Sequence, residues 1–357
     1  MIEKPILVMK RYIGVDVSKK TFTVAYSSDK KSKTSDFENT PKGIKKFIGT
    51  LKPEDHCVFE ATGNYGMNLL YMLNSSNIAV SMENPQKIKN FAKAMLTTTK
   101  TDSADAKMIA LYGEKMQPAE YKVPSEEILT LKQKRSVLRQ LKRQLVMNLN
   151  LKESLKVLPK IDTKALRTVD DMINFIQKQI EKVESDMASV AEETFSKQVK
   201  LLESVKGIGK TLAVALIVST GGFTYFSNSK QYTKFIGLAP IYEQSGSSIN
   251  YHGHINKNGD PYLRAQIYIA SLSAFQHNTE CKKMYKRLCA AGKPKQVAVI
   301  ACSHKLIRQA FAVIKNDTPY RDGYISENPM MSKTRKMANK LDEFDAPANG
   351  KNQGSNC

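Results

Sequence analysis

Residues 100–107 read Lys100-Thr101-Asp102-Ser103-Ala104-Asp105-Ala106-Lys107, and the first third of the chain is organised around them. Two aspartates three residues apart lie on one face of a helix, one turn from each other. Thr99 or Thr101 can cap this predicted helix, whose dipole stabilises carboxylates near its start. Because the two carboxylates still repel each other, the pair indicates a cation site. Two solvated acids in the first turn of an amphipathic helix are the alternative.

Hydrophobic alternation predicts a small sheet ahead of this helix. Residues 11–17 place Ile13, Val15 and Val17 on one face and Asp16 on the other, as in a half-buried strand. Further elements are expected at 21–26 and 33–37 (strands), 41–51 (helix), 57–60 (strand), 65–73 (helix), 78–82 (strand) and 85–95 (helix). The order βββαβαβα is that of the ribonuclease-H fold, in which metal-binding carboxylates gather at neighbouring strands and on a late helix.

Four carboxylates fall at such places. Asp16 lies in the first strand, Glu60 ends the fourth, and Asp102 and Asp105 open the last helix. We expect them to converge on two divalent cations about 4 Å apart that clamp a phosphodiester. Mg²⁺ suits a site made of oxygen ligands alone. Each acid also has an ordinary structural alternative, such as a strand end for Asp16.

The composition favours a nucleic-acid partner. With 55 Lys and Arg against 34 Asp and Glu, the 357 residues carry a net charge of +21 and a pI of about 9.6. Such a charge favours a polyanion through counterion release. The longest apolar run, residues 212–218, is far below the ~20 residues of a membrane-spanning helix. With no signal peptide evident, we expect an intracellular protein of two or three domains.

The five cysteines predict no cysteine-based site. They are odd in number and show no Cys-x-x-Cys spacing, so neither a disulfide framework nor a zinc site is expected.

A long helical section follows the acid pair. From Val169 to Val190, apolar residues recur at steps of four and three, which is typical of a coiled-coil seam. Leucines repeat every seven residues upstream, starting at Leu131, and Pro159 marks a turn. We expect a helical hairpin or an intersubunit coil.

The two arms of this section differ in charge. Residues 124–160 hold nine Lys and Arg against three acids, whereas residues 162–200 hold six against eight. We therefore expect the first arm to contact nucleic-acid backbone, with a solvated basic face as the alternative. The candidates are Arg135, Arg139, Lys142 and Arg143.

A glycine turn and a serine-rich stretch follow the helical section. Gly207-Ile208-Gly209 separates two predicted helices, and such a turn presents N–H groups to phosphate. Gly207, Gly209 and Lys210 are the candidates there, a tight turn packed in the core being the alternative. Tyr242-Glu243-Gln244-Ser245-Gly246-Ser247-Ser248 is predicted to be a polar loop.

Several motifs together resemble one known family. They are Gly14-Val15-Asp16-Val17-Ser18-Lys19, Glu60-Ala61-Thr62-Gly63, residues 100–106, residues 201–209, residues 235–240 and residues 245–248. This combination resembles the DEDD transposases of the insertion-sequence-110 family, relatives of Piv-type DNA invertases. The resemblance covers residues 11 to about 315.

The resemblance implies two joined domains, a RuvC-like nuclease domain with the ribonuclease-H fold over 1–120 and a mainly helical transposase domain over 201–325. Periodicity predicts the coiled-coil helical linker over 121–200, and a composition with few apolar residues predicts a disordered tail over 326–357. Ser245 aligns with the family's nucleophilic serine, with Ser247 and Ser248 as alternatives. Lys257 and Arg264 match basic positions of the family.

The family's activity supplies the expected partners. It implies an RNA-guided recombinase that forms a phosphoserine intermediate, uses Mg²⁺, and binds donor DNA, target DNA and a structured bridge RNA. A homodimer or homotetramer is expected, in the cytoplasm of a bacterial or archaeal cell and associated with the nucleoid when active.

Three other functions fit parts of the pattern. A RuvC-like nuclease or junction resolvase needs the four carboxylates but not the serine. A sugar-kinase-like ATPase shares the Gly-x-Asp-x-Ser stretch, but no later glycine-rich phosphate loop follows it. A non-catalytic nucleic-acid-binding scaffold would keep the basic surfaces and tolerate Asp102→Asn.

Overall fold

Contacts within the chain divide it into two units, Met1–Pro124 and Ser125–Cys357. The computed structural model describes residues 10–29, 31–61, 63–96, 101–245, 249–257 and 259–323, and the side chains of 242–245 and 249–253 are not described. The tail predicted over 326–357 therefore lies outside the described residues. The first unit ends close to the expected boundary at 120, and the division of the rest into linker and transposase domain stays a prediction.

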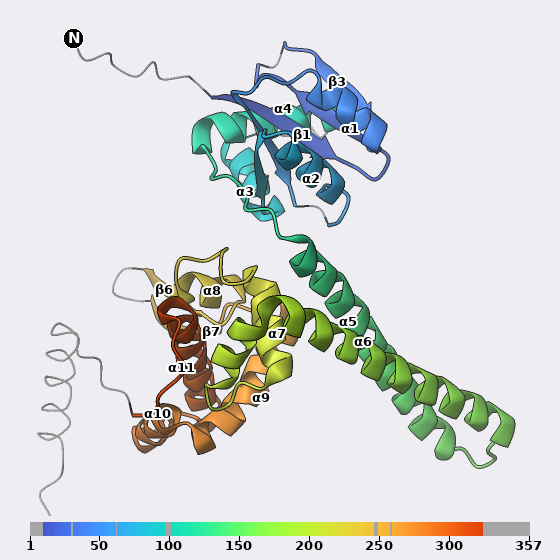
Figure 1. Cartoon of the computed structure of the whole chain (residues 1–357), viewed down its shortest axis with the longest axis vertical. Helices are drawn as coiled ribbons and strands as arrows, with labels where there is room; N and C mark the ends of the chain where they lie inside the picture. The colour runs from blue at the N-terminus through green and yellow to red at the C-terminus, as the bar shows by residue number, and fades with distance from the viewer. Residues whose placement is uncertain are drawn as a thin grey trace, which may run out of the picture. The chain divides into compact units, whose positions relative to one another are not determined.

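The first unit is built on a mixed five-stranded sheet in the order β3-β2-β1-β4-β5 (Figure 1). The first three strands form an antiparallel meander, and β4 and β5 run parallel to β1. The strands are β1 (Arg11–Val17), β2 (Thr21–Ala25), β3 (Thr34–Glu38), β4 (Asp55–Glu60) and β5 (Ala79–Glu83). Parallel strands need crossover connections, which here are helical.

Helices cover both faces of this sheet. Side chains of α1 (Pro41–Ile48) and α2 (Met67–Ser75) pack with Ile13, Val15 and Phe59 on one face. Side chains of α3 (Pro85–Ala94) and α4 (Asp102–Met116) pack with Tyr12 and Val58 on the other. Because successive strand residues point to opposite faces, Asp16 and Glu60 belong to the face of α3 and α4.

The predicted order of strands and helices is confirmed for the first unit. Strand 11–17 and the helix starts at Pro41, Pro85 and Asp102 agree with the structure, and the other ends differ by at most three residues. Helix α1 ends at Ile48 rather than at residue 51, where Gly49 lowers helix propensity.

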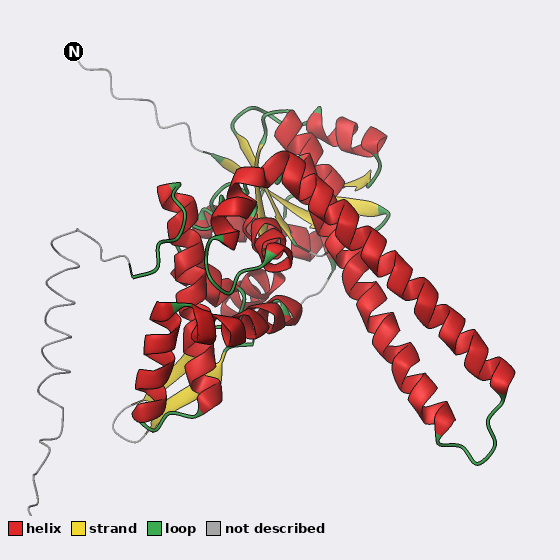
Figure 2. Ribbon diagram, turned by 60° about the horizontal axis from the view of Figure 1, so that its bottom comes forward, coloured by secondary structure: helices red, strands yellow, loops and turns green. Residues whose placement is uncertain are grey.

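The second unit begins with two long helices that lie side by side (Figure 2). They are α5 (Glu126–Lys156) and α6 (Thr163–Glu203), started by the side-chain caps of Ser125 and Asp162. Ile173, Ile176 and Ile180 of the predicted apolar seam are buried. A helical hairpin is thus present, while its description as a coiled coil stays a prediction.

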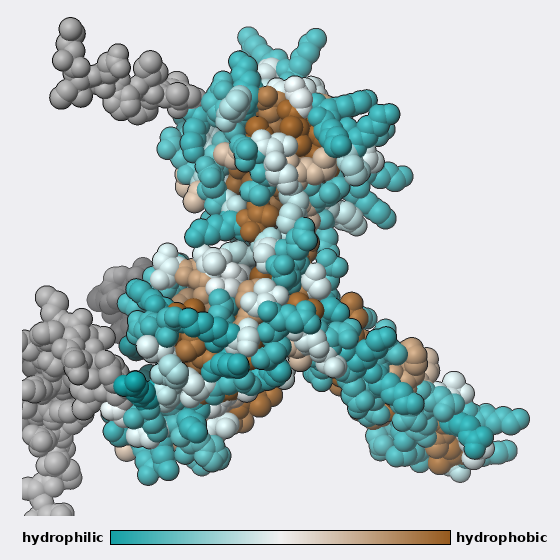
Figure 3. All heavy atoms as spheres, in the orientation of Figure 1, coloured by the Kyte–Doolittle hydropathy of each residue, from teal (hydrophilic) through white to brown (hydrophobic). Residues whose placement is uncertain are grey.

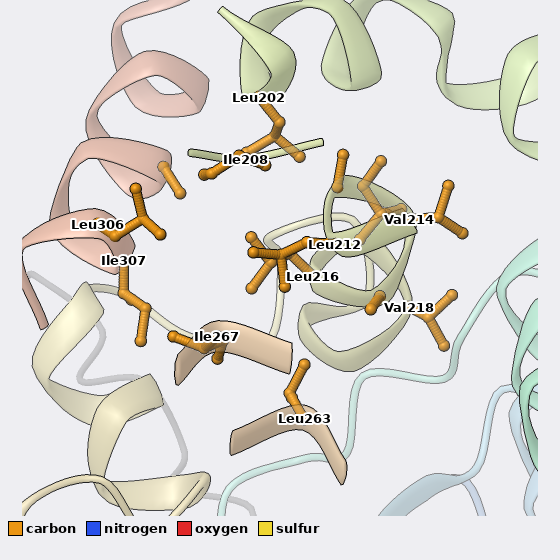
Figure 4. Close-up of a cluster of buried hydrophobic side chains, with 14 of the residues drawn as sticks. Leu202, Ile208, Leu212, Val214, Leu216, Val218, Leu263, Ile267, Leu306 and Ile307 are labelled. Atoms are coloured by element: carbon orange, nitrogen blue, oxygen red, sulfur yellow. The ribbon is translucent and has the colours of Figure 1, made fainter. Parts of the chain in front are cut away.

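The remaining helices form a core around α7. They are α7 (Lys210–Thr220), α8 (Ser229–Phe235), α9 (Pro261–His277), α10 (Thr279–Ala290) and α11 (Lys295–Asn316). Helix α7 is apolar on nearly all sides, and its Leu212 and Leu216 pack with Leu202, Ile267 and Leu306 (Figure 4). A two-stranded sheet, β6 (Pro240–Ser245) and β7 (Ile249–Ile255), completes the unit.

Helix α11 differs from the other helices in its length and composition. Among the described residues it is the one helix long and apolar enough to cross a membrane. Its buried residues include Cys302, Leu306 and Ile307, which join the core of the second unit. This packing is that of a core helix.

Candidate active site

Asp16 and Glu60 occur side by side at the same end of two neighbouring strands. In the parallel pair of β1 and β4, Val15 is opposite Phe59, so Asp16 and Glu60 are the next residues on the two strands. Both are half-buried. The sheet register therefore brings together two carboxylates that are 44 residues apart in the sequence.

Helix α4 crosses β1 at very close range. A Cβ on Gly14 would lie 2.0 Å from the carbonyl oxygen of Ala106 and 2.3 Å from the amide nitrogen of Ala110. Further along the helix, a Cβ on Gly113 would lie 2.9 Å from that of Tyr12. Helix and strand thus run in opposite directions, and the first turn of α4 lies toward the Asp16 end of β1.

That first turn carries the other two acids. The Thr101 hydroxyl accepts a hydrogen bond from the Ala104 amide at 3.1 Å, which caps the helix and starts it at Asp102. Asp102 is exposed and Asp105 is half-buried. The N-terminal end of the helix dipole favours both negative charges. Lys100, which precedes this turn in the motif, lies outside the described residues.

The four acids fit a divalent cation by their chemistry. Carboxylate oxygens are the side-chain ligands that Mg²⁺ usually takes in proteins. Within the described parts of the chain, however, no three His, Cys, Asp or Glu side chains are close enough to hold a metal ion as they stand. Convergence of Asp16, Glu60, Asp102 and Asp105 on a metal stays a prediction.

A further carboxylate, which the sequence did not single out, lies beside Glu60. Glu83 ends β5 directly opposite Glu60 in the β4–β5 register. Its carboxylate is 2.7 Å from the ammonium of Lys87, and this hydrogen bond raises the pKa of Lys87. The i,i+4 spacing of an acid and a lysine across a helix start was the signal available in the sequence. Lys87 reduces the negative charge at this edge of the sheet.

Asn39 joins the segments that follow the two acidic strands. Its side-chain amide donates to the carbonyl of Ser18 at 2.9 Å and to that of Tyr65 at 3.1 Å. Ser18 comes two residues after Asp16, and Tyr65 comes five after Glu60. One side chain therefore ties the two loops at the acidic end together.

The proposed nucleophile lies in the second unit, at the end of a strand. Ser245 is the last residue of β6 and is opposite Ile249 of β7. The predicted loop was wrong for residues 242–245, which belong to β6. The polar composition of these residues favours a loop, and pairing with β7 makes them a strand instead. The side chain of Ser245 and residues 246–248 lie outside what the structure describes.

The segment after this hairpin is held firmly. A Cβ on Gly259, whose φ is +105°, would lie 2.4 Å from the Phe235 carbonyl oxygen. Asp260 caps α9 through the amides of Tyr262 and Leu263, and its carboxylate is 2.9 Å from the guanidinium of Arg135. The chain leaving β7 is thereby fixed to α5.

Most of the predicted nucleic-acid-binding side chains are engaged within the second unit. Arg135 pairs with Asp260, Arg139 lies over the Tyr262 ring, and Lys142 pairs with Glu184 at 2.7 Å. Lys210 pairs with Glu192 at 3.4 Å, and Arg264 donates to the Ile236 carbonyl at 3.0 Å. Arg143 and Lys257 are exposed. Their contacts with nucleic acid stay a prediction.

The two glycines of the predicted phosphate turn differ. A Cβ on Gly207, at φ +106°, would lie 2.7 Å from that of Ala274, so this position is closely packed. Gly209 begins α7 without a side-chain cap and has open space at its Cβ position. The first glycine has a packing role, and of the two only the second faces open space.

Comparisons with known proteins place both units in one class. Residues 13–158 match a family described as "Transposase", of the IS110 type named for a DEDD motif. Residues 199–286 match the family described as "Transposase IS116/IS110/IS902 family". Together with the acidic end of the sheet, these matches define a transposase, an enzyme that acts on DNA.

Individual relatives agree with this class. The chain is 29% identical over 320 residues to the pilin gene-inverting protein of Moraxella bovis, covering 87% of this chain and 98% of that protein. It is 28% identical over 121 residues to the insertion element IS110 uncharacterized 43.6 kDa protein of Streptomyces coelicolor, covering 34% of this chain and 29% of that protein. The chain belongs to the IS110 family of transposases, which confirms the resemblance of its motifs.

Proposed function

We propose that this transposase is an RNA-guided recombinase that breaks and rejoins DNA through a covalent bond to Ser245. Its first unit acts as a RuvC-like domain with the ribonuclease-H fold, and Asp16, Glu60, Asp102 and Asp105 hold Mg²⁺. The observation that carries the proposal is the assembly of two acidic strand ends and the first turn of α4 at one end of the sheet.

The negative charge at the acidic end of the sheet favours a bound cation. Four carboxylates on three elements repel one another, and burial of part of their surface strengthens the repulsion. Bound Mg²⁺ would neutralise them and increase the electrophilicity of a phosphodiester. The four carboxylates would hold the cation, and Asn39 would keep the loops after β1 and β4 in place.

The serine supplies the nucleophile. Its Oγ would attack phosphorus and form a new P–O bond, while the bond from phosphorus to one sugar oxygen breaks. The proton lost by Ser245 is balanced by the proton gained by the departing sugar oxygen. Because a phosphodiester is retained, a second sugar hydroxyl can reverse the exchange on another strand without ATP.

A structured RNA of the element would select the DNA. Sequence would then be chosen by base pairing, and the protein would need mainly contacts to the backbone. The net charge of +21 is consistent with binding both nucleic acids. Two DNA partners also favour a homodimer or homotetramer.

A covalent-adduct assay tests the proposal. The protein is incubated with its RNA, Mg²⁺ and labelled target DNA, and denaturing gels show whether protein is linked to DNA. We expect an adduct with wild type and none with Ser245→Ala, Asp102→Asn or a chelator. Glu114→Gln is the matched control, because Glu114 is exposed further along the same helix α4.

The other outcomes identify the alternatives. An adduct with Ser245→Ala would move the nucleophile to another residue, and Ser247→Ala and Ser248→Ala would then be compared. Cleavage without an adduct would establish a plain nuclease. Binding without cleavage in wild type, unchanged by Asp102→Asn, would establish a scaffold. An adduct formed without RNA would refute RNA guidance alone.

A further inference from the structure

A long stretch of positive charge without any acidic residue lies near the end of the described part of the second unit. Residues 281–316, which include most of α10 and all of α11, contain nine Lys and Arg and no Asp or Glu. This tenth of the sequence therefore supplies a formal charge of +9 out of the total of +21.

Six of these cations gather around the end of α10 and the start of α11, and we call them the α10 patch. They are Lys282, Lys283, Lys286, Arg287, Lys293 and Lys295, and all six are exposed. The inner side of α10 carries Cys281, which is buried in the core. Figure 3 shows hydrophilic side chains over the part of the second unit where Figure 1 places α10.

The α10 patch has little negative charge to neutralise it. Among the described residues, the one ion pair of the patch joins Lys283 to Glu280 at 3.9 Å. Glu280 is closer to Lys305, at 3.1 Å, and its side chain is only 17% exposed. The cations of the patch thus remain directed at solvent.

The basic arm α5 is different. Lys134, Arg135 and Lys142 each pair with an acid of the same unit, on α6 or before α9. A cation with a protein carboxylate must lose that partner before it can bind phosphate, which reduces the net gain. The structure therefore favours α10 over α5 as the stronger anion-binding surface.

We propose that the α10 patch binds the phosphodiester backbone of nucleic acid. Lys282 with Lys286, and Lys283 with Arg287, form two neighbouring rows on α10. Within each row the two cations are four residues apart, which is about 6 Å along the helix axis. Phosphates along one strand of a duplex rise about 3.4 Å each, so such rows reach phosphates one or two nucleotides apart. Contacts of this kind position the nucleic acid without reading its sequence.

The start of α11 extends the surface. Gly292, at φ +73° with open space around it, turns the chain between the two helices. Lys293 and Lys295 flank Pro294, the N-cap residue, which makes no side-chain cap. The first amide groups of α11 therefore remain available to an anion beside the cations of the patch.

A phosphodiester backbone fits this surface better than an anionic membrane does. Membrane-surface helices bury an apolar face among lipids, whereas Cys281 on the inner side of α10 packs in the protein core together with Met284 and Tyr285. The inference rests on the proposed function only in that a DNA-acting enzyme needs such a surface. Binding and strand cleavage can be measured separately.

Binding of wild type and a patch variant tests the proposal. The variant replaces Lys282, Lys283, Lys286 and Arg287 by Gln. The control replaces Lys164, Arg167, Lys178 and Lys182 of α6 by Gln, which removes the same charge from exposed positions among acids. The probes are duplex DNA of random sequence, a structured RNA with the same number of phosphates, and vesicles containing anionic lipid. Circular dichroism verifies folding of both variants.

We expect the patch variant to bind nucleic acid about tenfold or more weakly, with a salt slope smaller by about 0.9 for each duplex phosphate that the variant no longer neutralises. The control should stay close to wild type. If the patch variant binds only DNA or only RNA more weakly than wild type does, that nucleic acid is the one that contacts the patch. Equal affinity and slope in patch and control variants would overturn the proposal, as would an effect confined to vesicles. Asp102→Asn should bind as wild type does. Wild-type protein that binds through the patch but never cleaves DNA would count against the proposed function and not against the patch.

Discussion

Replacing Gly14 by alanine tests how α4 is placed on the sheet. The added Cβ would lie 2.0 Å from the Ala106 carbonyl oxygen, whereas ordinary contact begins at 3.4 Å, so helix or strand must shift by about 1.4 Å. Both neighbouring atoms are backbone atoms and cannot rotate away. Overpacking of this kind costs about 1–3 kcal/mol of unfolding free energy.

The same shift should reach the active site. Asp102 and Asp105 begin the displaced helix, and a misplacement of about 1 Å in a catalytic group can cost about 100-fold in rate. Urea denaturation and the covalent-adduct rate measure the two effects. Gly49→Ala is the control, because its Cβ would make an ordinary contact at 3.4 Å. If Gly14→Ala were as stable and as active as wild type, the close approach of α4 to β1 would be refuted.

Three further predictions concern other contacts. Burial lowers the pKa of His56 below its ordinary 6.5. As pH falls, the unfolded chain therefore binds a proton at His56 before the folded chain does. The unfolding free energy should fall as pH drops from about 7 to about 5. Urea denaturation should show a weaker pH dependence of the unfolding free energy for His56→Gln than for wild type. A double-mutant cycle of Arg135→Ala and Asp260→Asn, the latter keeping the helix cap, should give a coupling on the order of 1 kcal/mol; additive effects would show that the pair is not formed. Asn39→Ala should raise the Mg²⁺ concentration needed for half-maximal adduct formation and weaken Mg²⁺ binding by calorimetry, whereas Asn90→Ala on α3 should not; equal requirements would remove the positioning role of Asn39.

Much of the first unit could be predicted because its signals are local. The alternation of Ile13, Val15 and Val17 defines a strand from within that strand. Threonine ahead of Asp102 and proline at positions 41 and 85 define helix starts by capping and by the fixed φ of proline. These features need no distant partner to be recognised.

The hairpin of β6 and β7 could not be predicted in this way. Residues 242–248 are polar and contain a glycine, which is the composition of a loop. Pairing of Ser245 with Ile249 makes the first part a strand instead. The hydrogen bonds of a two-stranded sheet depend on the partner strand, and local composition carries little of that information.

Sequence by itself determined the order of the elements, the acidic residues at their ends and the excess of positive charge. Tertiary structure alone decided which groups meet. Sheet register placed Glu83 beside Glu60, and the close approach of α4 to Gly14 brought Asp102 and Asp105 toward the Asp16 end of β1. Acids from distant segments paired with the cations of α5, whereas the cations of the α10 patch stayed exposed. The physical reason is range: propensity and periodicity act between near neighbours in the chain, whereas charge pairing and close packing depend on residues that only folding brings together.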